Sequence, residues 1–276
     1  MKMVKKDINQ PIADPVAEIL KLTQQDQKKT LEENYWPIEY LPSRYKLYPE
    51  GSKLYARTLN VREAKQLATI KPSNMDYILN EIVRKTTYGI PVEDLLIEDK
   101  LFIIFWLRDS TYKDSGFTID SYCPNDDCKA KMSVEFEVNN LDIIDLKDDV
   151  SEDYELTLKK SKDKLKIKFL RVKDENRVEN FKESNKNSLQ EYDEDFLSTA
   201  NRITEINGEA TKSLRSTYNY VEALDPVDFS YLLSYIAHIN FGVNPVLKNK
   251  CPSCGGDAPI GVTFRPDFFI PTYKFE

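Results

Sequence analysis

Two short cysteine motifs, C-P-N-D-D-C from Cys123 to Cys128 and C-P-S-C-G-G from Cys251, decide the fold of this chain. They contain all four of its cysteines: Cys123, Cys128, Cys251 and Cys254. A Cys-Pro turn with a second cysteine shortly after it is half of a zinc ribbon, and two halves make a closed, structural site. The motifs therefore predict one structural zinc ion. They argue against catalysis by that metal, because four thiolates leave no position for water.

Disulfide bonds and free thiols are the alternatives to zinc. Unrelated thiols would rarely fall into two pairs that each begin with Cys-Pro, and the spacing is unusual for a disulfide-stabilised secreted domain. Two features weigh against zinc: the first motif is longer than usual, and residues 129–250 separate the motifs. The only histidine, His238, could replace one cysteine as a ligand, but we favour an ordinary position near a helix end.

The segments around the motifs predict the domains. Residues 117–122 and 133–138 alternate between apolar and polar and read as strands on either side of the first motif. Before them, Asn60 begins a helix with Glu63 as its capping-box partner, and Asn74 begins another. The run LFIIFWL at 101–107 is apolar all round, which indicates an element covered on every side, and we favour a helix.

Between the motifs the sequence predicts an inserted α+β subdomain. Residues 155–158 and 164–172 read as a hairpin, and the charged stretch 173–195 as a solvated helix or a mobile loop. Asp225 caps a helix that has Pro226 at its first position. Its expected buried stripe contains Phe229, Leu232, Leu233, Ile236 and Ile239.

The predicted fold class is α+β, with a helical N-terminal domain and a zinc-ribbon β domain that carries a long insert. We divide the chain into an N-terminal arm (1–40), a mainly helical domain (41–116), the zinc ribbon (117–140 and 246–276) and the insert (141–245). The candidate partner-binding residues are Ile19 and Leu20 in the arm, and Phe268 and Phe269 near the end of the sequence. For the two phenylalanines, packing beneath the ribbon is the favoured alternative.

Composition excludes several functions. The chain has 276 residues and a net charge of −7, which argues against a general nucleic-acid binder. Its longest apolar run is too short to cross a bilayer, so we expect a soluble protein without a membrane span. No catalytic motif is present, and with one histidine no Cys-His nucleophile is credible. We therefore predict no catalytic residues and no enzyme activity.

Several stretches together resemble the baseplate-hub assembly proteins of contractile-tailed bacteriophages of the T-even type. The matching stretches are L-P-S at 41–43, T-L-N-V-R-E-A-K-Q-L from Thr58, D-K-L-F-I-I-F-W-L-R from Asp99, the first Cys-Pro motif, A-L-D-P-V-D from Ala223, F-G-V, C-P-x-C-G and D-F-F-I-P from Asp267. Their order and spacing carry the resemblance. The chain departs from the pattern in its stretched first motif, its long insert and its long N-terminal arm.

The resemblance implies a role in building the central hub on which the tail tube is polymerised. It implies contacts with other tail and baseplate proteins, an oligomeric assembly and a location in the host cytoplasm during assembly. The acidic net charge predicts no nucleic-acid partner. Whether the protein then stays in the virion baseplate is left open. Two alternatives are a nucleic-acid-binding zinc-ribbon protein of the transcription type, which a basic stripe over the ribbon would favour, and an enzyme with an unmarked active site.

Overall fold

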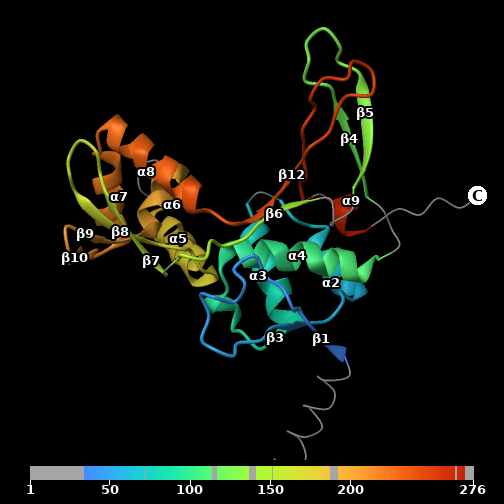
Figure 1. The fold of residues 1–276 in the computed structure, drawn as a ribbon. Coiled ribbons are helices and arrows are strands. Elements are labelled where there is room, and N and C mark those ends of the chain that lie inside the picture. The colour runs from blue at the N-terminus through green and yellow to red at the C-terminus, as the bar shows by residue number, and fades with distance from the viewer. Residues whose placement is uncertain are drawn as a thin grey trace, which may run out of the picture.

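The computed structural model describes residues 34–71, 73–113, 117–136, 141–150, 152–186, 192–264 and 266–270. This part of the chain combines helices with small antiparallel sheets, which confirms the predicted α+β class. Figure 1 shows a helical group around α4 (Ile97–Thr111), a second group of helices and strands beside it, and a β-hairpin that projects away from both. No helix in the described ranges has both the length and the apolar character needed to span a bilayer.

The first group contains three short strands and two helices before α4. The strands form one antiparallel sheet in the order β1-β2-β3. In chain order the elements are β1 (Trp36–Pro37), β2 (Tyr55–Ala56), α2 (Val61–Leu67), α3 (Met75–Thr86) and β3 (Thr87–Tyr88). Strand β2 covers only two residues, and the chain then turns toward the start of α2.

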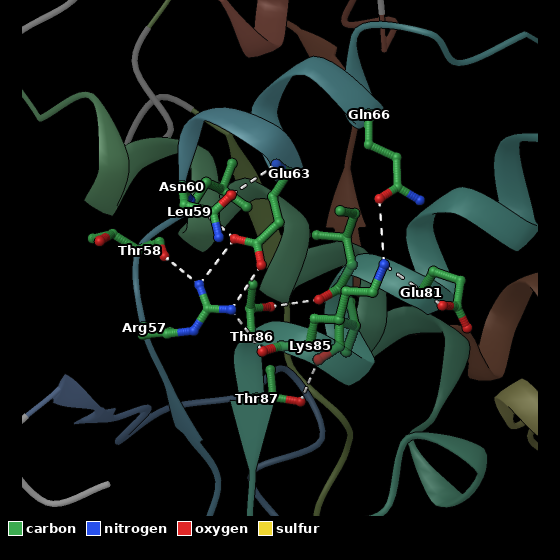
Figure 2. A network of polar contacts seen from close by, with 12 residues as sticks. Arg57, Thr58, Leu59, Asn60, Glu63, Gln66, Glu81, Lys85, Thr86 and Thr87 are labelled. Atoms are coloured by element: carbon green, nitrogen blue, oxygen red, sulfur yellow. Dashed lines mark hydrogen bonds and ion pairs between the residues drawn. The ribbon is translucent and has the colours of Figure 1, made fainter. Parts of the chain in front are cut away.

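The predicted capping box is present at the start of α2. The side chain of Asn60 accepts a hydrogen bond from the Glu63 backbone N–H at 3.0 Å, and the Glu63 carboxylate accepts one from the Asn60 N–H at 2.9 Å. The same carboxylate accepts two bonds from the Arg57 guanidinium, at 2.7 and 2.9 Å. Arg57 also donates to the carbonyl of Lys85, so this network ties the start of α2 to the end of α3 (Figure 2).

The central helix α4 contains the apolar run 101–107, which confirms the preference for a helix. Before α4 lies the short 3₁₀ turn η1 (Val92–Asp94). It stops because the backbone becomes extended at Leu95 and Leu96, immediately before α4 begins. The buried members of the run are Phe102, Ile103, Ile104, Phe105 and Leu107.

Two hairpins form the projecting part of the molecule. The first is β4 (Phe117–Tyr122) with β5 (Lys131–Phe136), and the second is β12 (Val246–Leu247) with β13 (Ile260–Gly261). Figure 1 shows the second alongside the first, with α9 (Pro266–Phe269) near the base. The strand at 117–122 has its predicted bounds. The strand predicted at 133–138 begins earlier, at Lys131. Strand β13 is short because the chain then turns toward α9.

The two ends of the insert lie side by side. β6 (Asp142–Ile144) pairs antiparallel with β11 (Gly242–Asn244). Gly242 has a positive φ of 114°, and a Cβ atom there would come within 3.0 Å of the Glu98 side chain. Glycine therefore lets the returning chain pass close to α4, and the pairing returns the chain to the projecting hairpins.

The insert contains a four-stranded antiparallel sheet in the order β10-β9-β8-β7, together with four helices. Its elements in chain order are β7 (Asp153–Thr157), β8 (Lys164–Lys168), α5 (Val172–Asn185), α6 (Glu194–Arg202), β9 (Ile203–Ile206), β10 (Glu209–Ala210), α7 (Leu214–Glu222) and α8 (Pro226–Ile239). The predicted hairpin is confirmed, and much of the charged stretch forms the solvated helix α5.

The cap of α8 is also confirmed, because the Asp225 side chain accepts a hydrogen bond from the Val227 N–H at 2.9 Å. The predicted stripe on α8 is only partly buried. Leu232 and Ile239 are buried, but Leu233 is exposed. The helix packs through a narrower face than the apolar pattern suggested.

Candidate metal centre

The first cysteine motif forms a compact turn at the tip of the projecting hairpin. β4 leads into Cys123, whose N–H donates to the carbonyl of Ala130 at 2.9 Å. The N–H groups of Cys128 and Lys129 both donate to the carbonyl of Asn125, at 3.0 and 3.1 Å. Lys129 then takes a positive φ of 46°, which turns the chain back into β5. These backbone hydrogen bonds hold the turn together and so accommodate the longer spacing of this motif.

The second motif is tighter. The N–H of Cys251 donates to the carbonyl of Gly256 at 2.8 Å, and the N–H of Gly255 donates back to the carbonyl of Cys251 at the same distance. Gly255 has a positive φ of 71°, a conformation that glycine adopts without strain. The turn therefore brings Cys251 and Cys254 to the same side of the chain, facing the first motif.

The four sulfur atoms meet in one cluster. All lie within 4.8 Å of one another. The Sγ atoms of Cys123 and Cys254 are 3.7 Å apart, and those of Cys128 and Cys251 are 3.8 Å apart. Four sulfurs at about 2.3 Å from a central zinc ion would be about 3.8 Å apart, whereas a disulfide requires about 2.05 Å. The four residues are free cysteines, and their arrangement fits one tetrahedral metal ion.

The surroundings of the sulfur atoms lower the pKa of the Cys251 thiol and raise the pKa of the Cys123 thiol. The N–H groups of Cys254 and Ser253, together with the neighbouring thiols, lower the pKa of the Cys251 thiol to about 6. The N–H of Asn125 acts in the same direction on Cys123, but burial and the other sulfur atoms raise the pKa of that thiol to about 12. Adjacent thiolates repel one another, so a bound dication would be needed to hold all four sulfurs deprotonated.

His238 does not join the cluster. It is exposed at the last turn of α8, where its Nε2 atom lies 3.2 Å from Nζ of Lys147. The structure thus agrees with the preferred position near a helix end. In the described part of the chain, the four cysteines are the one group of three or more His, Cys, Asp or Glu residues placed to share a metal ion.

The predicted partner-binding residues fall into two classes. Ile19 and Leu20 lie outside the described residues. Phe268 and Phe269 have no exposed surface and belong to an aromatic cluster at the base of the hairpin. Phe268 contacts Phe117 of β4 at 5.2 Å and Phe105 of α4 at 5.7 Å between ring centroids. The two rings therefore pack inside the protein, which was the favoured alternative, and they offer no surface to a partner in this conformation.

Comparison with known proteins identifies the family. A family model described as T4 bacteriophage base plate protein matches residues 39–270. The chain belongs to this family. The match covers both cysteine motifs and the insert between them, and it gives the chain a structural role in a phage baseplate, in association with other baseplate proteins of the virion tail. No curated protein and no solved structure matches the chain.

Sequence analysis missed the buried charges of this baseplate protein. Asp99 is fully buried on α4, where it accepts hydrogen bonds from the Tyr48 hydroxyl at 2.7 Å and the Ser43 N–H at 3.0 Å. Lys100 beside it is also buried and bonds to Glu175 of α5 at 2.6 Å. The only signal was the D-K pair that opens the apolar run, and sequence does not reveal which partners such charges have.

Proposed function

We propose that this chain forms part of the central hub of the baseplate, or helps to build it, and that it acts through protein contacts rather than catalysis. The observation that carries the proposal is the family match over residues 39–270, which is supported by the order of motifs that resembles hub assembly proteins. As a component of the hub, the chain would be one subunit of an oligomeric assembly that forms in the host cytoplasm.

The proposal gives the cysteine cluster a structural role with zinc as the metal. Cys123, Cys128, Cys251 and Cys254 would supply all four ligands, so the ion would hold the two hairpins together without an open position for substrate. β12 and β13 have only two residues each, and their backbone pairing alone contributes little. A zinc ion that fastens their tip to the first hairpin would stabilise the whole projection.

We also propose the domain division given by the sequence: the ribbon at 117–140 and 246–276, interrupted by an insert at 141–245. The pairing of β6 with β11 supports it, because the chain leaves the first hairpin and returns to the second at neighbouring positions. The N-terminal arm, 1–40, and the helical domain, 41–116, complete the division. An insert of this kind could be shortened without separating the cysteine motifs.

Charges near the cluster favour protein contacts over nucleic-acid binding. Three lysines close to the cysteine motifs are each paired with an aspartate: Lys129 with Asp126 at 2.6 Å, Lys131 with Asp120 at 3.0 Å and Lys248 with Asp142 at 2.5 Å. A nucleic-acid site needs lysine and arginine charge that is available to phosphates. These three lysines are already paired, and Lys250, exposed beside Cys251, is a single charge rather than a basic stripe.

The test is an infection in which the gene for this chain carries a stop codon. The proposal expects infected cells to accumulate heads without complete tails, and expects a supplied copy of the chain to restore tails. Cross-linking mass spectrometry of hub intermediates should then connect the chain to other baseplate proteins. Normal tails in the absence of the chain would contradict the proposal. So would a catalytic activity of the purified chain that explains why tail assembly needs it.

A further inference from the structure

A hollow of about 900 Å³ lies between α3, α5 and α6, where the helical group meets the insert. Apolar side chains line part of it: Met75 on α3, Ile97 at the start of α4, Leu170 and Val178. Its volume falls within the range of sites that bind ligands or short peptide segments. Helices from distant parts of the sequence thus form a hollow that has both apolar and charged lining residues.

The rim carries more negative than positive charge. Its acidic residues are Asp76, Glu175, Glu179, Glu183 and Glu194, and its basic residues are Lys182 and Lys186. Lys182 pairs with Glu194 at 2.6 Å, and Lys186 pairs with Glu183. Among the described residues, no ion pair neutralises Asp76 or Glu179, and both are exposed. Two carboxylates therefore remain available to a cation from outside.

Glu175 extends the negative charge into the wall. Its carboxylate accepts hydrogen bonds from Lys100 at 2.6 Å and from Asn80 at 3.2 Å. Burial raises the pKa of Glu175, Lys100 opposes that effect, and the nearby charge of Asp76 adds to it. Because Lys100 already pairs with Glu175, the negative charge left for an incoming cation is that of Asp76 and Glu179.

Asn201 of α6 is a buried polar residue in the wall of the hollow. The residue lines the hollow, is only 1% exposed, and donates from Nδ2 to the carbonyl of Asp174 at 2.9 Å. Its Oδ1 atom is buried and accepts no hydrogen bond within the described residues. A buried acceptor without a donor is costly.

We propose that this hollow binds a lysine- or arginine-bearing segment of a neighbouring baseplate protein. The cationic group would meet Asp76 and Glu179 at the rim. Its aliphatic stem would lie along Met75 and Val178, as the stems of long basic side chains do on apolar surface. The inference rests on the proposed function, because that function supplies the class of partner.

The lining residues of the hollow favour a lysine or arginine side chain over a metal ion or a nucleic acid. A metal ion would need several carboxylate oxygens close together, whereas these carboxylates belong to no group placed to share an ion. A nucleic acid would be repelled by the acidic rim. Tyr77, 59% exposed beside Asp76, adds a ring on which a lysine or arginine head can rest.

The binding test uses the purified full chain and two short acetylated peptides of alanine and leucine, one with two lysines and one with glutamines in their place. Titration calorimetry at low salt should show saturable binding of the lysine peptide alone, weakened by added salt. Changing Asp76→Asn together with Glu179→Gln should weaken binding roughly tenfold, which is the sum expected of two exposed ion pairs. Glu50→Gln, an exposed acidic site outside the hollow, should leave it unchanged.

Three results of the peptide titrations would overturn the inference. These are no saturable binding of the lysine peptide, equal binding of the glutamine peptide, or equal effects of the double variant and Glu50→Gln. Self-association of the chain that the double variant abolishes would assign the hollow to a second copy, and would also contradict a different partner. Because these measurements use purified protein, they are independent of tail production: a failed infection test leaves peptide binding intact, and absent peptide binding leaves the hub role standing.

Discussion

The Sγ atoms of Cys123 and Cys254 lie 3.7 Å apart, although the residues are 131 positions apart in the sequence. The pair formed by Cys128 and Cys251 repeats this relationship at 3.8 Å. Each contact joins one motif to the other. The two hairpins of the projection are therefore coupled at their tip, and a change in either motif should disturb both.

Loss of one sulfur should loosen the projection. Zinc binding to four-ligand peptide sites contributes on the order of 10 kcal/mol to folding, so Cys254→Ser should lower the melting temperature measured by circular dichroism. It should also remove most of the sensitivity to a chelator. Ser253→Ala, a neighbouring exposed change that keeps every sulfur, is the matched control. A Cys254→Ser protein that melts like the control, with and without chelator, would show that the cluster has no structural role.

The enclosed helix α4 gives a prediction about the core. Phe105 is 1% exposed and packs edge-on against Phe268. Phe105→Ala should lower the free energy of unfolding by roughly 3–5 kcal/mol, since it removes a buried ring and leaves a cavity. Urea unfolding measures this change. Val61→Ala on the exposed side of α2 should stay within about 0.5 kcal/mol, and a similar small loss at Phe105 would contradict the enclosed position of α4.

The network around Glu63 gives a prediction about pH. Burial raises the pKa of this carboxyl, but the hydrogen bonds from Arg57 and Asn60 outweigh it, and the pKa is lowered on balance. A carboxyl with a lowered folded-state pKa stabilises the fold above its unfolded pKa of about 4.3, and this stabilisation is lost as the pH falls below that value. Glu63→Gln should therefore cost about 2 kcal/mol at neutral pH.

The pH series separates this effect from a general loss of packing. The difference in stability between the wild-type chain and Glu63→Gln should shrink as the pH falls from 6 to about 3. Glu50→Gln, whose carboxyl is exposed, should show no such trend. A constant difference between the wild-type chain and Glu63→Gln across the series would mean that the charge of Glu63 does not act through Arg57.

Local features of the fold could be predicted from the sequence. The caps at Asn60 and Asp225 follow from residues within three positions of one another, and both motifs follow from cysteine spacing. The strand at 117–122 follows from its alternation. Such signals work because the interacting groups are neighbours in the chain.

Features made by distant residues could not be predicted in this way. Nothing near Asp99 indicates that Tyr48 and Ser43 supply its hydrogen bonds. The acidic run of α5 looked like a solvated face, and only the approach of α3 and α6 makes it one side of a hollow. The same is true of Asn201, whose unsatisfied oxygen depends on the packing of several elements.

The N-terminal arm remains a prediction about assembly. Ile19 and Leu20 are its expected apolar anchors, so replacing both with serine should reduce the yield of complete tails in infected cells while purified protein keeps its melting temperature. Anchors of this kind account for most of the energy of a small interface. Deleting residues 1–34 should have a stronger effect of the same kind. Normal tail yield from the deletion would remove the arm from the assembly mechanism.

Native mass spectrometry of the full chain, purified without chelator, tests the central claim that the four cysteines hold one structural zinc ion. The account predicts a single species with one zinc per chain, and predicts that acid release of the metal exposes four reactive thiols together. A chain that carries no metal when zinc is supplied, or one whose four thiols react fully while zinc stays bound, would contradict the claim.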